Sequence, residues 1–317
     1  MKLLRNCLMG LRYKHWTFIR TLTYFLQRVE KKIVGTSFFE KRYVNIMYKH
    51  DINNYNQFLS VDVLGSEYLK IGNVKMTSLN TLEDKCTFLY IWEDIFMSYL
   101  YHNDSYEKSI FSQLDKFLNE GLYGYQDENI DVTIKSNDVV IDAGAWAGEY
   151  SAYCACKGAK VYAFEPSSQS YELLERTSAL NENRIIPIKM GLGNECATFQ
   201  ISIGNAAGNL IVEDTMKNDD NTEPVVITTL DTFIEENGIE KVDFLKADIE
   251  GYERKFLEGA KSTIQKFLPK IAICTYHLPD DAEVLETLIK DCNPNYKIVH
   301  SRHKLFAQCL SSLPFDH

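Results

Sequence analysis

The sequence predicts an α/β protein in which an open, mostly parallel sheet occupies the carboxyl-terminal part of the chain. From residue 131 onward, short apolar runs alternate with segments of helical character. The first run ends in an acid followed by two glycines, Asp142, Gly144 and Gly148, and the second ends in another acid, Glu165. Strands that alternate with helices are typical of βαβ units, and ligands of such sheets bind at the carboxyl ends of the strands.

The individual elements of this sheet can be placed from the apolar runs and the segments between them. Buried parallel strands are predicted at residues 138–141, 160–164, 185–188, 243–247 and 270–274. Helices are predicted over residues 148–157, 168–180 and 253–266, and a later helix over residues 282–290.

The alternation is interrupted between residues 196 and 230. Residues 198–203 and 225–227 predict two strands on either side of the polar stretch 213–223. We expect this stretch to be a surface loop, either beside a substrate opening or without a function of its own.

Residues 1–120 lack this rhythm and predict a mainly helical extension in front of a ligand-binding domain at residues 121–317. Residues 2–33 carry apolar side chains every three or four positions, with Lys and Arg between them. A basic amphipathic helix of this kind either lies on an anionic membrane surface or docks against the rest of the protein. We also expect short strands at residues 60–64 and 68–71 and helices over residues 88–100 and 105–118.

The charge distribution argues against nucleic acid as a partner. The chain of 317 residues has a net charge of −10. Residues 1–50 hold 11 Lys and Arg against 2 Asp and Glu, and the rest of the chain holds 23 against 42. A domain that binds nucleic acid needs a basic surface for the phosphates, and this acidic body does not provide one.

Composition and motifs exclude several other classes. The eight cysteines form no zinc-binding pair, which indicates reduced thiols and a cytoplasmic location. No run of 18 apolar residues is present, and the amino terminus lacks the continuous apolar core of a signal peptide. The absence of G-x-S-x-G, P-loop and H-E-x-x-H motifs argues against common hydrolases and kinases.

The glycine turn after the first strand predicts a cofactor site. Gly144, Ala145 and Gly148 allow a ligand to approach the backbone closely, and the following helix offers free N–H groups. Glu165 comes 21 residues after Gly144, where such folds place the acid that binds a ribose. Asp142 would repel a pyrophosphate but attract the amine and sulfonium of S-adenosylmethionine, so we favour that methyl donor over a nicotinamide dinucleotide.

Two further segments supply candidate catalytic groups. Asp248 and Glu250 follow the strand at residues 243–247, and with Lys246 they alternate, so an extended chain would point all three the same way. These acids could orient an acceptor hydroxyl, act as a base or hold a cation, although no third oxygen ligand is evident and we expect no metal. His277 follows the strand at residues 270–274, where it is suited to proton transfer.

Taken together, these segments resemble the FkbM family of S-adenosylmethionine-dependent methyltransferases over residues 121–278. The segments that carry the resemblance are Gly121–Tyr125, Asn137–Ala145 with Gly148, Tyr162–Pro166, Thr229–Asp231, Lys246–Gly251 and Phe256–Ala260. The resemblance implies a Rossmann-like, seven-stranded class I methyltransferase sheet that ends in an antiparallel hairpin. It also implies that Asp142, Gly144 and Gly148 line the methionine side of the cofactor and that Glu165 binds its ribose. Thr177 and Met190-Gly191 depart from the residues that are frequent in the family.

The resulting hypothesis is an O-methyltransferase that acts on a hydroxyl, most often that of a sugar in a glycan or glycolipid. His277 is our first choice of base, and Asp248 or Glu250 is the second. Two other hypotheses stay open at this point. One is a non-catalytic scaffold or partner of a glycan-assembly enzyme that keeps the fold, and the other is an NAD-linked oxidoreductase, against which the missing third glycine counts.

Overall fold

The computed structural model describes residues 56, 59–71, 73–79, 85, 123–202, 211–212, 222–301 and 303–310. The helices predicted at residues 2–33, 88–100 and 105–118, and almost all of the polar stretch 213–223, lie outside these residues and stay predictions. The chain divides into two compact units, and residues 60–78 and 111–317 form the one that contains nearly all of the described residues.

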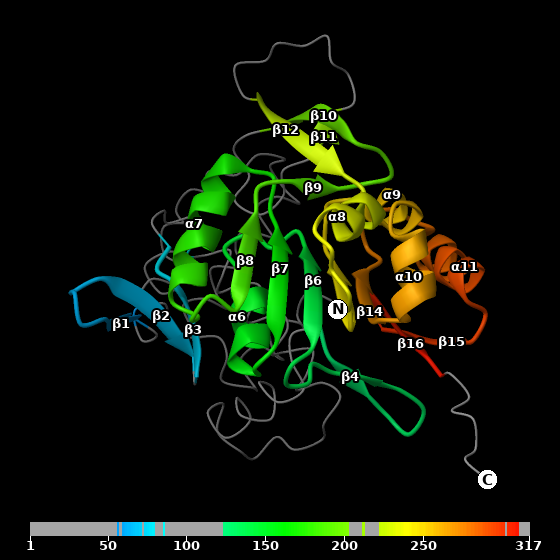
Figure 1. Ribbon diagram of the computed structural model, residues 1–317, viewed down its shortest axis with the longest axis horizontal. Helices are drawn as coiled ribbons and strands as arrows, with labels where there is room; N and C mark the ends of the chain where they lie inside the picture. Colours follow the sequence, from blue (N-terminus) through cyan, green and yellow to red (C-terminus); the bar gives the residue numbers. More distant parts are fainter. Residues whose placement is uncertain are drawn as a thin grey trace, which may run out of the picture. The chain divides into compact units, whose positions relative to one another are not determined.

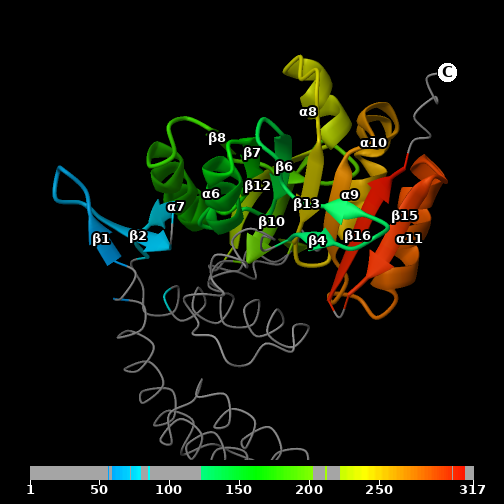
Figure 2. The same ribbon diagram turned by 90° about the horizontal axis from the view of Figure 1, so that it is seen from below.

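A seven-stranded sheet forms the centre of this unit, in the order β8–β7–β6–β13–β14–β16–β15. Figure 2 shows β8 on one side of this sheet and β15 on the other. The strands are β6 (Val139–Ala143), β7 (Lys160–Phe164), β8 (Ile185–Ile188), β13 (Phe244–Ala247), β14 (Lys270–Cys274), β15 (Tyr296–His300) and β16 (Lys304–Cys309). Strands β6, β7, β8, β13 and β14 are parallel, and the β15–β16 hairpin joins β14 antiparallel. The predicted Rossmann-like, seven-stranded class I methyltransferase sheet is therefore confirmed.

Helices follow the strands as the sequence pattern predicted. Helices α6 (Glu149–Cys156) and α7 (Ser168–Ala179) lie beside β6, β7 and β8 (Figure 1). Helices α8 (Leu230–Glu236), α9 (Glu253–Glu258), α10 (Lys261–Phe267) and α11 (Asp281–Cys292) share one apolar core with β6, β13 and β14. Of the described helices, none is long and apolar enough to cross a membrane.

The single helix predicted over residues 253–266 is wrong, because the chain forms two helices there. Gly259 ends α9, and a Cβ atom at this position would lie 1.9 Å from the backbone oxygen of Gly193. The close approach of these two backbones needs a glycine and interrupts the helix. Asp231 then accepts hydrogen bonds from Ser262 N (2.8 Å) and Thr263 N (2.7 Å), which caps the start of α10.

The interruption between residues 196 and 230 is a separate small sheet. It has the order β11–β10–β12–β9 and contains β9 (Gly191–Leu192), β10 (Ala197–Ser202), β11 (Ile211–Val212) and β12 (Thr222–Thr228). The two predicted strands are thus confirmed as the antiparallel pair β10 and β12. Gly191 packs closely against β12, because a Cβ atom there would lie 2.4 Å from Cδ1 of Ile227.

A hairpin ahead of residue 121 also belongs to this unit. This hairpin, β2 (Glu67–Ile71) and β3 (Val74–Thr77), forms a three-stranded sheet with β1 (Leu59–Val61). Strands thus lie on both sides of Gly65 as expected, although the one predicted at residues 60–64 ends at Val61. Thr77 N donates to Thr177 Oγ1 at 3.0 Å, and this bond ties β3 to α7. A short pair, β4 (Tyr125–Gln126) and β5 (Asp131–Val132), precedes β6.

Candidate functional site

The glycine turn between β6 and α6 is shaped by two close approaches of the chain to itself. Gly144 has φ 76°, and a Cβ atom there would lie 2.0 Å from the backbone oxygen of Asp248. Gly148 has φ 86°, and its Cβ atom would lie 2.9 Å from Leu174 and 3.0 Å from Thr177. Both positions favour glycine because L side chains rarely adopt positive φ. Gly148 therefore packs against α7, and Gly144 allows the ends of β6 and β13 to meet.

Asp142 lies beneath this turn, where it pairs with a lysine. Asp142 and Lys246 are register partners on β6 and β13, and their side chains are 0% and 1% exposed. Lys246 Nζ lies 2.9 Å from Asp142 Oδ1 and also donates to Gly144 O at 2.7 Å, and Ser151 Oγ donates to Asp142 Oδ2 at 2.6 Å. We expected Asp142 to line the methionine side of the cofactor. That role stays a prediction, and in the structure the Asp142 carboxylate pairs with the ammonium that supports the turn.

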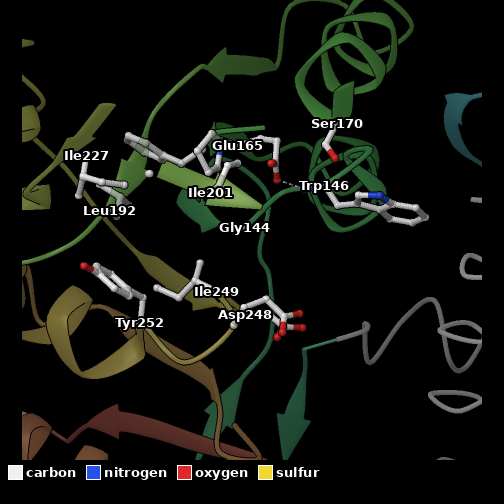
Figure 3. Close-up of a pocket in the computed structure, with 14 residues that line it drawn as sticks. Gly144, Trp146, Glu165, Ser170, Leu192, Ile201, Ile227, Asp248, Ile249 and Tyr252 are labelled. Carbon is white, nitrogen blue, oxygen red and sulfur yellow. Dashed lines mark hydrogen bonds between the residues drawn. The ribbon is translucent and has the colours of Figure 1, made fainter. Parts of the chain in front are cut away.

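A pocket with about 670 Å³ of empty space opens at the carboxyl ends of the parallel strands. The register pairs Ala143 with both Phe164 and Ala247, so the turn at Gly144, Glu165 and Asp248 come to the same edge. In the view of Figure 3, Gly144 lies between Glu165 and Asp248. The apolar lining residues are Phe164, Leu192, Ile201, Ile227, Ile249 and Tyr252. A mostly apolar pocket with a few polar groups suits a small organic ligand such as a nucleoside.

Glu165 is the buried acid of this pocket. Its Oε2 accepts from Trp146 N at 2.9 Å and its Oε1 accepts from Ser167 N at 2.9 Å, so both oxygens are held by the backbone. Burial raises the pKa of this carboxyl to about 7, although the two backbone bonds favour the ionised form. The fixed carboxyl, 8% exposed, retains lone pairs for a ligand in the pocket.

Asp248 is held by two tyrosines at the opposite wall. Tyr123 OH donates to Asp248 Oδ2 at 2.7 Å, and Tyr276 OH donates to Oδ1 at 2.9 Å. Burial opposes ionisation, but the Lys246 ammonium and these two hydroxyls lower the pKa of Asp248 below its ordinary value. Asp248 is thus suited to stay a carboxylate beside a positively charged ligand.

His277 lies among three acids next to Asp248. Its Nδ1 is 2.9 Å from Glu253 Oε1, and its Nε2 is 3.5 Å from Glu250 Oε2 and 3.8 Å from Asp248 Oδ1. Burial opposes protonation, but contacts with Glu250 and Glu253 raise the pKa of His277 to about 10. The three acids thus stabilise the protonated form of the imidazole, and the role of His277 as the base stays a prediction.

The structure thus brings together four of the predicted residues, since Gly144, Glu165, Asp248 and Glu250 all line the pocket. His277 does not line the pocket but contacts two of these residues, Asp248 and Glu250. Asp142, Ala145 and Gly148 do not line the pocket either. We expected Lys246, Asp248 and Glu250 to point the same way in an extended chain, but β13 ends at Ala247. The backbone is left-handed at Glu250, with φ 55°, so the three side chains do not follow one extended strand.

Sequence reasoning missed several supporting residues. Tyr123, Tyr276 and Glu253 come from three segments, and no local pattern joins them to Asp248 and His277. The partner of Asp142 could have been found, because Lys246 is a charged residue inside a predicted buried strand and needs a buried acid. Thr177, which departs from the family's usual residue, donates to Ala147 O at 2.7 Å and so supports the glycine turn.

The seven-stranded sheet, with the glycine turn and the acid-lined pocket at the carboxyl ends of its strands, is the arrangement of a class I methyltransferase. Residues 142–298 match the methyltransferase FkbM domain. The chain belongs to the FkbM methyltransferase family, as its sequence resemblance predicted.

Two curated relatives and one solved structure illustrate this likeness. Methyltransferase sdnD of Sordaria araneosa is 26% identical over 191 residues, which is 50% of this chain and 74% of that protein. Hexuronic acid methyltransferase AglP of Haloferax volcanii is 26% identical over 132 residues, which is 41% of this chain and 53% of that protein. The crystal structure of an FkbM methyltransferase from Methylobacillus flagellatus is 23% identical with a TM-score of 0.43, over 54% of this chain and 43% of that one.

Proposed function

We propose that this protein transfers a methyl group from S-adenosylmethionine to a hydroxyl, most often on a sugar of a glycan or glycolipid. The observation that carries the proposal is the fixed carboxyl of Glu165 facing Asp248 across an apolar pocket in a chain of the FkbM family. Support for a sugar acceptor comes from the similarity to a protein named as a hexuronic acid methyltransferase.

The pocket offers a place for each part of the donor. The free lone pairs of Glu165 would accept hydrogen bonds from the ribose hydroxyls. The apolar walls from β9, β10 and β12 would hold the adenine ring. The carboxylate of Asp248, beside Gly144, would face the positively charged methionine end of the donor.

The transfer itself needs a base and good alignment. As the acceptor oxygen forms its bond to the methyl carbon, the bond from carbon to sulfur breaks, and the sulfonium becomes a neutral thioether. The hydroxyl proton leaves to Glu250, whose carboxylate lines the pocket, is 32% exposed and contacts His277. His277 holds that carboxylate in place, and the remaining rate enhancement comes from aligning donor and acceptor.

We propose further that the acceptor is a small molecule or a glycan and that nucleic acid is not a substrate, because the body of the chain is acidic. We place the enzyme in the cytoplasm, with residues 1–33 in contact with an anionic membrane surface. The excess of Lys and Arg over residues 1–50 supports this contact. Flotation with anionic vesicles, with and without residues 1–33, tests it, and equal flotation of both chains contradicts it.

Calorimetry with S-adenosylhomocysteine tests the donor site. The wild-type chain should bind with one site per chain, and Glu165→Ala should weaken binding at least tenfold, because the ribose loses its acceptor. Glu286→Gln changes an acid on α11 that does not line the pocket and should bind as the wild type does. A folded wild-type chain that does not bind favours the scaffold hypothesis, and binding of NADH instead favours the oxidoreductase.

Methylation assays then identify the acceptor class. A chain that binds the donor should methylate a hydroxyl of a uronic acid or another sugar, with the methyl group found on oxygen by mass spectrometry. Methylation of nitrogen, or of no sugar in a broad panel, would contradict the proposed acceptor and leave the donor site intact.

A further inference from the structure

We propose that Asp248, Glu253 and His277 form a binding site for a divalent metal ion beside the donor pocket. The inference rests on the proposed function in one respect, because the ion would bind the acceptor hydroxyl of the same reaction. It concerns residues that line or adjoin the pocket from three elements, the ends of β13 and β14 and the start of α9.

The distances within this cluster suit an ion. One donor atom from each of the three side chains can be chosen so that all lie within 4.8 Å of one another. With bonds of about 2.1 Å, two ligand atoms on opposite sides of an ion are roughly 4.2 Å apart and two at right angles are roughly 3.0 Å apart, so the three side chains would move toward one another to close the site. Among the residues that the structure describes, this is the single group of three or more acids, histidines and cysteines whose ligand atoms lie this close together.

A buried, unsatisfied oxygen is the second observation that points to an ion. Glu253 is 0% exposed, and its Oε1 accepts from Ile249 N at 2.9 Å. Its Oε2 is also buried and has no hydrogen-bond partner. A buried carboxylate oxygen without a partner is costly, and a bound cation removes that cost.

The surrounding contacts hold the proposed ligands as outer partners hold them in metal sites. His277 has Glu253 at Nδ1 and both Asp248 and Glu250 at Nε2. Of these three acids, only Glu250 lies outside the proposed ligand set, so it is the outer partner that would orient the His277 ring. The hydroxyls of Tyr123 and Tyr276 fix the Asp248 carboxylate in the same way.

The ligand chemistry selects the kind of ion. Two carboxylates and one imidazole suit a divalent ion that accepts both oxygen and nitrogen, such as Mn²⁺, and there is no thiolate for a softer ion. A Lewis acid at this place would bind the acceptor oxygen and lower the pKa of its hydroxyl, so that Glu250 removes the proton more readily.

Titration of the full-length chain, free of any polyhistidine tag, with Mn²⁺ alone tests the site. Free Mn²⁺ is followed by its electron paramagnetic resonance signal. We expect one saturable site per chain, with at least tenfold weaker binding in His277→Gln and in Glu253→Gln. If Glu253→Gln does not fold, His277→Gln decides the question, since the His277 side chain is 9% exposed and that of Glu253 only 1%.

Glu286→Gln is the matched control for these variants. It removes a comparable contact between a glutamate and a histidine, because Glu286 Oε2 lies 2.6 Å from His300 Nε2. This variant should bind Mn²⁺ as the wild type does. Absence of saturable Mn²⁺ binding in the wild type would overturn the inference. Undiminished binding in both site variants would overturn it too, because the ion would then lie elsewhere.

Binding of S-adenosylhomocysteine, measured on the same samples, separates this inference from the proposed function. A chain that binds the donor product but no Mn²⁺ contradicts only the metal site. A chain that binds Mn²⁺ in the expected way but no donor product contradicts the proposed function and supports the site.

Discussion

Removal of the buried Lys246 ammonium should destabilise the domain strongly, because Asp142 would then be left without its counter-charge. The two charges lie 2.9 Å apart, and neither side chain is more than 1% exposed. At an effective dielectric constant of about 20, their attraction amounts to roughly 6 kcal/mol, which the cost of removing both charges from water largely offsets. Loss of one partner alone leaves that cost without the attraction, so Lys246→Met should cost about 3–5 kcal/mol.

Urea unfolding followed by circular dichroism at neutral pH measures this difference. Lys135→Met is the matched control, because Lys135 pairs with Asp131 at 2.8 Å but is 56% exposed. Such a surface pair contributes about 0–1 kcal/mol. The double variant Asp142→Asn with Lys246→Met should lose less than the sum of its two single variants, because the second change removes the orphaned charge.

Two outcomes would refute this reasoning. Equal unfolding midpoints for Lys246→Met and Lys135→Met would show that the buried pair does not stabilise the turn. If Asp142→Asn keeps the wild-type midpoint but no longer binds S-adenosylhomocysteine, Asp142 contacts the cofactor, as the sequence led us to expect, and does not act through Lys246.

Three further predictions follow from single contacts. Gly144→Ala places a Cβ atom 2.0 Å from the backbone oxygen of Asp248, so the free energy of unfolding in urea should fall by at least about 2 kcal/mol. Gly238 also has a positive φ but has no atom within 4 Å of a Cβ, so Gly238→Ala is the control and should lower this free energy by about 1 kcal/mol. Asp231→Ala removes the cap of α10 and should cost about 1–2 kcal/mol, while calorimetry should show unchanged affinity for S-adenosylhomocysteine. Burial raises the pKa of Glu149 from 4.5 to about 8, so its contribution to stability is complete below pH 4.5 and is lost as the pH rises through 8. The melting temperature of the wild type should therefore fall over this range, and Glu149→Gln should show a smaller fall; an equal fall in both chains would contradict the assignment.

Much of the fold was predictable because its signals are local. Each of the five predicted parallel strands is present, since a run of apolar residues that is buried on both faces differs clearly from its polar surroundings. The break at Gly259 was not predictable, because it depends on the backbone of Gly193, which is 66 residues away in the chain. Helical periodicity continues through residue 266 and contains no sign of that contact.

The candidate site divides in the same way. By itself, the sequence determined the strand that ends at Ala143, the glycine turn after it and the acid at Glu165, because each is written in consecutive residues with a known backbone requirement. Only the tertiary structure decided which charges meet. The fold pairs Asp142 with Lys246 and brings Glu253 into contact with His277. Strand register and helix packing set these distances, because the segments are far apart in the chain.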